Sequence, residues 1–522
     1  MAIIDFFDRG WLVNPNGVAY VADDQEYSFT EIRELSCRIA NGLLSAGFAK
    51  GAKGAVWSAN HPTAWTCTLG LWRAGLVWIP INTRNGLDEN LYILDAFDAD
   101  MVFFQKDFAG EIEKIRGNLP KVKLWVCIDA DLETAMSLDK FIQGQPATPP
   151  DITYDMEDVV AISPTGGTTG KPKGVMNTHR TFQTFVANYM IGVTYGFDEK
   201  IVNLAAAPMT HTAGIVTLPC TARGGMVVVL TKPDPVMLFQ SIVRYKVTEL
   251  FLPPTATYRL LEIPGIDSPD FKALIGSLKY VLYGTAPMSV EKLKKAIELL
   301  GPIMSGGYGQ TECFASISAL SPKAHFSGGG LASDTRLSSV GQPSPLITVR
   351  IVDDNNQPLP AGSRGEICVR GDLVMKGYYK EPEKTAETII DGWLHTGDIG
   401  YFDDEGYLYL TDRKKDMIIS GGFNVYPIEV ERIVWGHPAV QDCAVIGVPD
   451  ADWGEAVKAV VELKPGASVS AEELIAFCRE RLGGVKTPKS IDFIETLPRS
   501  PVGKVLKKNL REPYWKGTGR SI

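Results

Sequence analysis

A strand-like run, a helix-like run and a second strand-like run follow one another three times along this sequence. The strand-like runs are rich in Val, Ile, Leu and Trp, and the runs between them repeat apolar residues at helical spacing. Parallel strands need a long crossover between them, so this order favours βαβ units. The units span residues 53–82, 226–254 and 278–309. A further helix is predicted over residues 28–50, with Ser28 as its N-cap and Glu31 three residues later.

The length of 522 residues predicts more than one domain, because single cores stop growing near about 250–300 residues. Short β-like runs follow residue 340, and a compact α+β pattern begins near residue 425. We predict an α/β fold with a large N-terminal domain over residues 1–414, which combines βαβ-type subdomains with a β-rich subdomain. A small mobile α+β domain is predicted over residues 415–522. The Pro-rich segment 143–151 is predicted to be a surface linker between subdomains.

Composition excludes several classes of protein. A net charge of -9 gives no broad basic surface, so we expect no nucleic-acid partner. The eight Cys are scattered without a CxxC pair, which makes a disulfide framework and a zinc site improbable. The sequence starts without a basic region and apolar run, and it holds no stretch of about 18 uncharged apolar residues. We therefore expect a cytoplasmic protein without a membrane span.

The stretch "SPTGGTTGKPKGV" at residues 163–175 is the strongest functional signal. Gly residues let backbone N–H groups approach an anion closely, and the Thr hydroxyls and Lys side chains add donors and charge. The Walker pattern is absent, because Pro172 follows Gly170 and Lys171 and leaves no hydroxyl at the magnesium position. A phosphate-binding loop is the favoured interpretation, and a flexible connection between a strand and a helix is the alternative.

The part "TGGTTGKPKGV" resembles the phosphate-loop signature of the adenylate-forming superfamily, which includes acyl- and aryl-CoA ligases, peptide-synthetase adenylation domains and beetle luciferases. Gly166 is a departure, because the family more often has Ser there. Four more runs match family signatures in the family's order, so the resemblance covers nearly the whole chain. They are "YGQTE" at 308–312, "HTGD" at 395–398, "DRKKDMIISGGFNVYPIEVE" at 412–431 and "PRSPVGKVLKK" at 498–508.

This resemblance implies an ATP-dependent acyl- or aryl-CoA ligase. A carboxylic acid would first become an acyl-adenylate with release of pyrophosphate, and rotation of the small domain would then allow transfer to the CoA thiol with release of AMP. Because the acid and ATP are both anions, charge neutralisation and positioning must dominate such a reaction. ATP, Mg²⁺ and CoA are therefore the expected cofactors.

The resemblance also implies roles for individual residues. Lys504 would bridge the substrate carboxylate and the phosphate, Glu312 would bind Mg²⁺, and Thr311 would meet the α-phosphate. Taken alone, "YGQTE" is equally compatible with a turn at the end of a strand that carries a solvated Glu. Lys504 alone is compatible with a surface lysine, as most lysines are, and an ordinary Gly-Asp turn is the favoured interpretation of Asp398 alone. The expected cofactor-binding residues are Thr165, Gly166, Gly167, Thr168, Thr169, Gly170 and Lys173 for phosphates, Gly284, Thr285, Ala286 and Tyr308 for adenine, Asp398 and Arg413 for ribose, and Gly421, Gly422 and Trp453 for CoA, with Lys415 as the hinge.

The acyl pocket is expected around His211, close to the substrate carboxylate. The other pocket residues implied by the resemblance are Phe185, Thr212, Tyr283, Gly306 and Gly307. The small residues at 306 and 307 suggest room for a long or wide apolar acid. Residues 209–218 contain no Asp or Glu to pair with a substrate ammonium, which argues against an α-amino acid.

The acceptor is expected to be free CoA, because the sequence ends soon after Lys504 without a carrier domain. Lys486 and Lys489 are expected to meet CoA phosphates, but Val485 and Thr487 replace an aromatic residue and an Arg of some relatives, so a separate acyl carrier protein stays open. A non-catalytic nucleotide-binding protein is a further alternative, and the presence of Lys504 and Glu312 argues against it. A homodimer also stays open.

Overall fold

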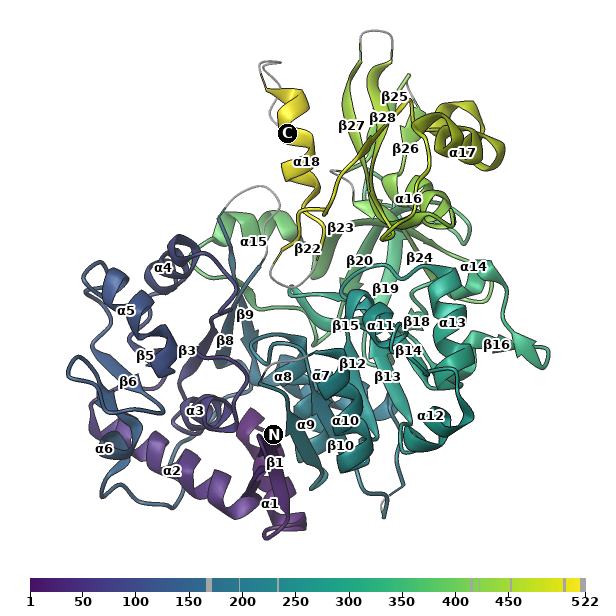
Figure 1. Ribbon diagram of the computed structural model, residues 1–522. Coiled ribbons are helices and arrows are strands. Elements are labelled where there is room, and N and C mark those ends of the chain that lie inside the picture. Colours follow the sequence, from purple (N-terminus) through teal and green to yellow (C-terminus); the bar gives the residue numbers. More distant parts are fainter. Residues whose placement is uncertain are drawn as a thin grey trace.

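The predicted strand–helix–strand units form two large sheets (Figure 1). The computed structural model describes residues 1–165, 171–196, 198–231, 234–413, 416–421, 423–450, 453–500 and 504–516, and at 315, 412 and 413 it describes the backbone alone. In each of the three predicted units, a helix joins two strands of a largely parallel sheet. The predicted helix runs from Phe29 to Ser45, and Ser28 and Glu31 form the expected capping box at its start.

The 9-stranded sheet has the order β18-β15-β14-β13-β12-β10-β11-β1-β2. Its strands are β1 (Val18–Ala22), β2 (Gln25–Ser28), β10 (Val202–Ala205), β11 (Met226–Val229), β12 (Glu249–Leu252), β13 (Tyr280–Tyr283), β14 (Met304–Gln310), β15 (Cys313–Leu320) and β18 (Gln342–Pro343). The 8-stranded sheet has the order β21-β9-β8-β4-β3-β5-β6-β7. Its strands are β3 (Lys53–Trp57), β4 (Val77–Pro80), β5 (Met101–Phe104), β6 (Leu124–Cys127), β7 (Met136–Ser137), β8 (Val159–Pro164), β9 (Gly174–Thr178) and β21 (Gly377–Tyr378).

Helices pack on both faces of these sheets. Successive strand residues point to opposite faces, so Val227 and Val229 enter the central core while Val228 enters another. Helices that contribute to the central core are α1 (Ile3–Val13), α2 (Phe29–Ser45), α3 (Pro62–Arg73), α6 (Leu138–Ile142), α7 (His179–Gly192) and α9 (Thr217–Thr221). The outer faces carry α10 (Pro235–Tyr245), α11 (Pro254–Leu260), α12 (Pro269–Leu274), α13 (Val290–Leu300) and α14 (Asp334–Leu337) on the larger sheet, and α4 (Leu87–Ala96) and α5 (Ala109–Arg116) on the smaller.

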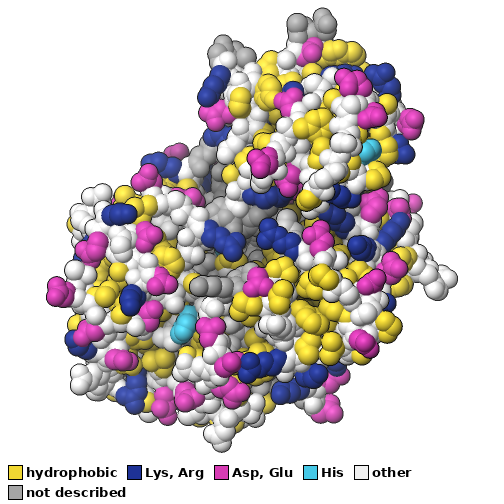
Figure 2. Space-filling model, in the orientation of Figure 1, with side chains coloured by type: hydrophobic (Ala, Val, Ile, Leu, Met, Phe, Trp, Pro, Cys, Tyr) yellow, Lys and Arg dark blue, Asp and Glu magenta, His cyan; other side chains and the backbone are white. Residues whose placement is uncertain are grey.

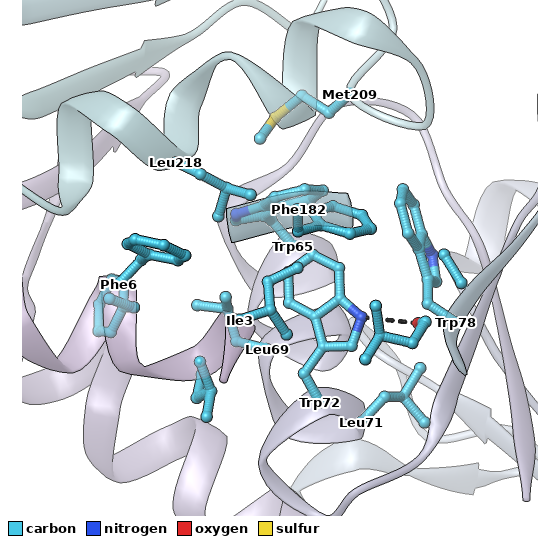
Figure 3. Packing of buried hydrophobic residues seen from close by; sticks show 14 of the residues in the cluster. Ile3, Phe6, Trp65, Leu69, Leu71, Trp72, Trp78, Phe182, Met209 and Leu218 are labelled. Carbon is cyan, nitrogen blue, oxygen red and sulfur yellow. Dashed lines mark hydrogen bonds between the residues drawn. The ribbon is translucent and has the colours of Figure 1, made fainter. Parts of the chain in front are cut away.

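Three tryptophans fix the middle of the central core (Figure 3). Trp65, Trp72 and Trp78 meet edge to face, with ring centroids 5.7–5.8 Å apart and planes at 89–90°. Edge-to-face contacts place the positive ring edge against a negative ring face, which favours this geometry. The Trp72 Nε1 donates to the Val160 carbonyl at 2.9 Å, so the helix α3 is tied to β8.

Two smaller sheets follow after residue 340, as the change in sequence pattern predicted. The first is built from β19 (Thr348–Val352), β20 (Gly365–Arg370), β22 (Ile389–Ile390), β23 (Trp393–Phe402) and β24 (Leu408–Arg413). The second, in the upper lobe of Figure 1, is built from β25 (Ile418–Ser420), β26 (Phe423–Val425), β27 (Val440–Asp450), β28 (Gly454–Leu463) and β29 (Ser490–Phe493). Helices α16 (Pro427–Trp435), α17 (Ala471–Lys486) and α18 (Lys507–Trp515) accompany the second sheet.

The α/β fold predicted from the sequence is confirmed, with one correction. Segment 143–151 lies at the surface but does not join two subdomains, because β7 before it and β8 after it belong to the same sheet. Its carbonyls at Gln145, Pro146 and Thr148 accept hydrogen bonds from Arg38 and Asn41 of α2. The boundary at residue 415 falls between β24 and β25, and it stays a prediction.

Candidate active site

A cavity of about 1790 Å³ lies at the hollow between the upper lobe and the rest of the molecule, along which Figure 2 shows Lys and Arg side chains. Lining residues between 78 and 407 form what we call the body wall, and those between 441 and 506 form the lobe wall. Predicted site residues from distant parts of the chain line it together. They are Thr165, Lys173, Phe185, His211, Thr212, Tyr283, Gly284, Thr285, Gly306, Gly307, Thr311, Glu312, Asp398 and Lys504.

Other predicted residues are placed differently. Ala286 and Tyr308 do not line the cavity, and neither do Gly421 and Trp453 of the lobe. The predictions for Gly166, Gly167, Thr168, Thr169, Gly170, Lys415 and Gly422, and for the Arg413 side chain, fall outside the described residues.

Asp398 is held by a hydrogen bond from beneath the cavity surface. The Tyr308 hydroxyl donates to its Oδ2 at 2.7 Å, and both residues are buried. Burial raises the pKa of Tyr308 and the Asp398 charge adds to the shift, so the hydroxyl stays a donor. The backbone of Asp398 pairs with that of Arg413 across β23 and β24, and their shared role at the ribose stays a prediction. Adenine stacking by Tyr308 stays a prediction.

Glu366 supports the turn that precedes Asp398. Its Oε1 accepts from the Gly397 N–H at 3.0 Å, and its Oε2 lies 3.3 Å from the His395 Nδ1. Gly397 has φ of +71°, a conformation that favours glycine. Both Glu366 and His395 line the cavity, and the sequence did not point to either as a site residue.

Glu312 and Lys173 share one tyrosine. The Tyr378 hydroxyl donates to the Glu312 Oε1 at 2.9 Å, and the Lys173 Nζ lies 3.8 Å from the centroid of the same ring. Burial lowers the pKa of Lys173, and the Glu312 charge opposes that shift. Tyr378 was missed because 66 residues separate it from Glu312, so no local pattern announces the contact.

The donor set suits magnesium bound together with a nucleotide. Among the described residues, no group of three or more His, Cys, Asp and Glu side chains could hold a metal ion. Mg²⁺ usually binds one or two carboxylates plus substrate phosphates and waters, rather than a cage made wholly of protein. A single carboxylate at Glu312 fits this coordination preference of Mg²⁺.

His211 faces the cavity as a neutral imidazole. The Asn82 Oδ1 accepts a hydrogen bond from the Arg84 N–H, which fixes the orientation of the Asn82 amide. The Asn82 Nδ2 therefore donates to the His211 Nε2 at 3.1 Å. Burial lowers the pKa of His211 to about 4, which keeps the ring uncharged near neutral pH. Asn82 is a cavity residue that the sequence did not single out, because 129 residues separate it from His211.

The two adjacent glycines in the middle of β14 are not equivalent. A Cβ at Gly306 would lie 2.8 Å from the Tyr283 hydroxyl, which also lies 3.1 Å from the His325 Nε2. A Cβ at Gly307 would meet nothing closer than 3.9 Å, and this residue is exposed. The room that the sequence suggested at both positions therefore exists at Gly307, while Tyr283 fills it at Gly306.

Lys504 enters the cavity from a short loop of the lobe. Ser500 and Lys504 exchange backbone and side-chain hydrogen bonds of 2.7 and 3.2 Å, and Arg499 pairs with Val505 across a β-bridge. Arg499 in turn contacts the Asp442 carboxylate at 2.5 Å and that of Glu462 at 3.7 Å. Lys504 is half-buried, unlike an ordinary surface lysine.

Gly421 and Trp453 lie together on the lobe, outside the cavity. A Cβ at Gly421 would approach the Trp453 ring to 2.4 Å, and Gly421 has φ of +57°. The Trp453 side chain is 40% exposed, and the Lys489 Nζ lies 5.1 Å from its ring centroid. Lys486 contacts Glu429 at 2.5 Å, and its role at a CoA phosphate stays a prediction.

Comparisons with known proteins identify the family of this chain. A family model described as AMP-binding enzyme matches residues 7–379, and one described as AMP-binding enzyme C-terminal domain matches residues 429–504. The chain belongs to the AMP-binding enzyme family. No helix among the described residues has the length and apolar character needed to cross a membrane.

Relatives and solved structures match over nearly their whole length. Feruloyl-CoA synthase from Amycolatopsis sp is 35% identical over 505 residues, covering 96% of this chain and 97% of the relative. The long-chain-fatty-acid–CoA ligase FadD13 of Mycobacterium tuberculosis is 32% identical and covers 97% and 98%. The structure of the amide bond synthetase McbA from Marinactinospora thermotolerans is 29% identical with a TM-score of 0.87, covering 98% of this chain and 100% of that one. The prediction of an adenylate-forming enzyme is thus confirmed.

Proposed function

We propose that this protein is an AMP-forming ligase that joins an acyl or aryl carboxylic acid to CoA. One observation carries the proposal: Glu312, Asp398 and Lys504, from three separate signatures, line a single cavity. The named CoA ligases among the relatives support the same assignment.

The first step places two anions together, and the residues of both walls offset that repulsion. The substrate carboxylate oxygen attacks the α-phosphorus, and the bond to the leaving pyrophosphate breaks. The Lys504 ammonium, from the lobe wall, offsets the negative charge that builds up between the carboxylate and the α-phosphate. The Lys173 ammonium, from the body wall, offsets the charge of the departing pyrophosphate. Asp398 accepts the ribose hydroxyls, and Glu312 would hold Mg²⁺, which would supply screening of the phosphate charge.

The second step transfers the acyl group. The CoA sulfur attacks the carbonyl carbon of the acyl-adenylate, the thiol proton leaves to solvent, and the bond to AMP breaks. We assign the lobe residues Gly421 and Trp453 to CoA and the segment near Lys415 to the hinge, so that the lobe turns a second face to the cavity. In the described parts of the chain, the lobe meets the rest of the molecule through part-buried polar contacts such as those of Lys292 with the Gln441 carbonyl and Arg432 with the Ser338 carbonyl, which a rotation can exchange for others.

The acid is proposed to be apolar. The cavity that His211 faces is also lined by Phe185, Ile215, Val216 and Phe251, and it has open space beside Gly307. An acid with an aliphatic or aromatic group would bind well against these side chains, because burying its apolar surface stabilises the complex by about 25 cal/mol per Å².

A product assay by mass spectrometry tests the proposal. The protein is incubated with ATP, Mg²⁺ and a mixture of fatty, aromatic and alicyclic acids, with and without CoA. Acyl-CoA and AMP formed from one class of acid would support it. Acyl-adenylate that accumulates despite CoA would point to another acceptor, such as an acyl carrier protein or an amine, and the absence of AMP with every acid would refute the ligase assignment.

A further inference from the structure

Tyr378 lies between two oppositely charged groups of the body wall. Its ring faces the Lys173 ammonium and its hydroxyl reaches the Glu312 carboxylate, while the residue itself is only 4% exposed. In the part of the chain that the structure describes, no ion pair of 4.0 Å or less joins Lys173 to Glu312 directly. A direct pair would neutralise two charges that face the same cavity.

The backbone fixes this tyrosine to both neighbours. Tyr378 pairs with Val175 across β21 and β9, directly beyond the loop that carries Lys173. The Met375 N–H donates to the Glu312 carbonyl at 2.9 Å, so the same segment also holds the turn with Glu312. The Tyr378 N–H donates to the Thr385 Oγ1 at 2.9 Å. Because this backbone is held on several sides, orienting the neighbours of Tyr378 costs little further conformational entropy.

We propose that Tyr378 is a positioning residue that keeps Lys173 and Glu312 apart and leaves both charges available to the metal–nucleotide complex. The hydroxyl occupies one carboxylate oxygen of Glu312, which leaves Oε2 for a cation. An aromatic face holds an ammonium without neutralising it, which a carboxylate partner would do. The inference rests on the proposed function only in requiring that a nucleotide binds in this cavity.

The next residue provides a matched control. Tyr379 also donates its hydroxyl to a carboxylate, the Asp98 Oδ2 at 2.8 Å, and also lies near a lysine, with the Lys53 Nζ 5.8 Å from its ring centroid. Tyr379 and Asp98 do not line the cavity. The variants Tyr378→Phe and Tyr379→Phe therefore each remove a hydroxyl oxygen that donates to a carboxylate, the first in the cavity wall and the second outside it.

The test measures binding of Mn²⁺ with α,β-methylene-ATP by electron paramagnetic resonance, without any acid. We expect Tyr378→Phe to weaken Mn²⁺ binding by about 5- to 20-fold, because Glu312 is then free to turn toward Lys173. Tyr379→Phe should stay within about 2-fold of the unchanged protein. Equal Mn²⁺ affinities for the two variants would overturn the proposal.

A double-mutant cycle separates positioning from a general packing effect. If the hydroxyl acts through Glu312, then adding Tyr378→Phe to Glu312→Gln should change Mn²⁺ affinity by less than about 2-fold. Full additivity of the two changes would contradict this. Tyr378→Met, which removes ring and hydroxyl together, should also weaken binding of α,β-methylene-ATP without metal by about 3-fold or more, because Lys173 loses its support. Failure of the ligase assignment looks different: metal and nucleotide would bind normally while no acid yields AMP.

Discussion

The two walls of the cavity are held by different kinds of contact. In the body wall, Asp398, Glu312 and His211 each have a hydrogen-bond partner from a distant segment: Tyr378 and Asn82 lie in the same wall, and Tyr308 lies outside the cavity lining. In the lobe wall, Lys504 depends on a short loop, and the lobe meets the body through contacts such as the 3.5 Å hydrogen bond from Lys292 to the Gln441 carbonyl.

This difference separates binding from chemistry. A wall built from buried hydrogen bonds is organised before the nucleotide arrives, so it sets affinity. A cation delivered on a separately folded lobe acts when the lobe closes, so it sets the rate. Changes in the body wall should therefore alter nucleotide binding in both half-reactions, and changes in the lobe wall should alter one half-reaction.

The largest effect is expected from Lys504→Ala. Adenylation should slow by about 10²- to 10³-fold, because the lobe wall loses the cation that meets the growing charge. Thioester formation from supplied acyl-adenylate should change by less than about 3-fold. Pyrophosphate release and acyl-CoA formation measure the two halves separately, and Lys508→Ala, at an exposed lysine of α18, is the control. Equal losses in both halves would contradict the division between the walls.

Asp398→Asn tests the other wall. The amide keeps the shape of the side chain but carries no negative charge, so it accepts hydrogen bonds from the two ribose hydroxyls less strongly. The Tyr308 hydroxyl also loses its charged partner. The KM for ATP should rise by about 10- to 100-fold, as expected when a hydrogen bond to a charged group is weakened. Binding of AMP, measured by calorimetry, should weaken in parallel. A fall in kcat with no change in KM would show that Asp398 acts in the chemistry instead.

Local sequence patterns predicted the elements well. The capping box at Ser28 and the three βαβ units depend on residues within a few turns of one another, so their physics is visible in a short window. The sequence predicted the wrong role for segment 143–151, because that role depends on which strand pairs with β4. The strand is β8, so the segment connects two strands of one sheet.

The site could be predicted as far as motifs reach. The signatures predicted that Glu312, Asp398 and Lys504 share one site. They did not predict that Tyr378 and Tyr308 donate to the two carboxylates, or that Arg499 ties the Lys504 loop to Asp442. Those contacts join residues that only the fold makes neighbours. Gly306 illustrates the same limit: a small residue indicates space, but whether a partner fills that space depends on Tyr283.

The seam between lobe and body should give a smaller effect. Glu429 of α16 contacts Arg364 of the body at 2.6 Å and Lys486 of α17 at 2.5 Å. Glu429→Gln should slow adenylation by about 2- to 5-fold, because partly exposed ion pairs contribute about 1 kcal/mol or less. ATP affinity should not change. Glu480→Gln, which removes an exposed pair with Arg481 inside the lobe, is the control, and an equal effect of both variants would rule out a role for the seam.

The smallest effect concerns pH and compares two histidines. Burial lowers the pKa of His179, which does not line the cavity, and of His211, in the body wall, from 6.5 to about 4. A lowered histidine pKa means that the unfolded chain binds the proton more tightly, so stability is full above pH 6.5 and falls as the pH drops toward 4. For His179, which is 1% exposed and accepts from the Ile3 N–H, the loss should be about 1 kcal/mol at about pH 5.5.

Denaturant unfolding at several pH values checks this expectation. His179→Gln should flatten the decline in unfolding free energy between about pH 7.5 and 5.5, because the variant has no group there to titrate. Over the same range His211→Gln should leave the shape of the adenylation pH profile unchanged, since a ring that is already neutral supplies position rather than charge. A profile that loses a limb in His211→Gln would mean that this histidine transfers a proton, and the body wall would then take part in the chemistry as well as in binding.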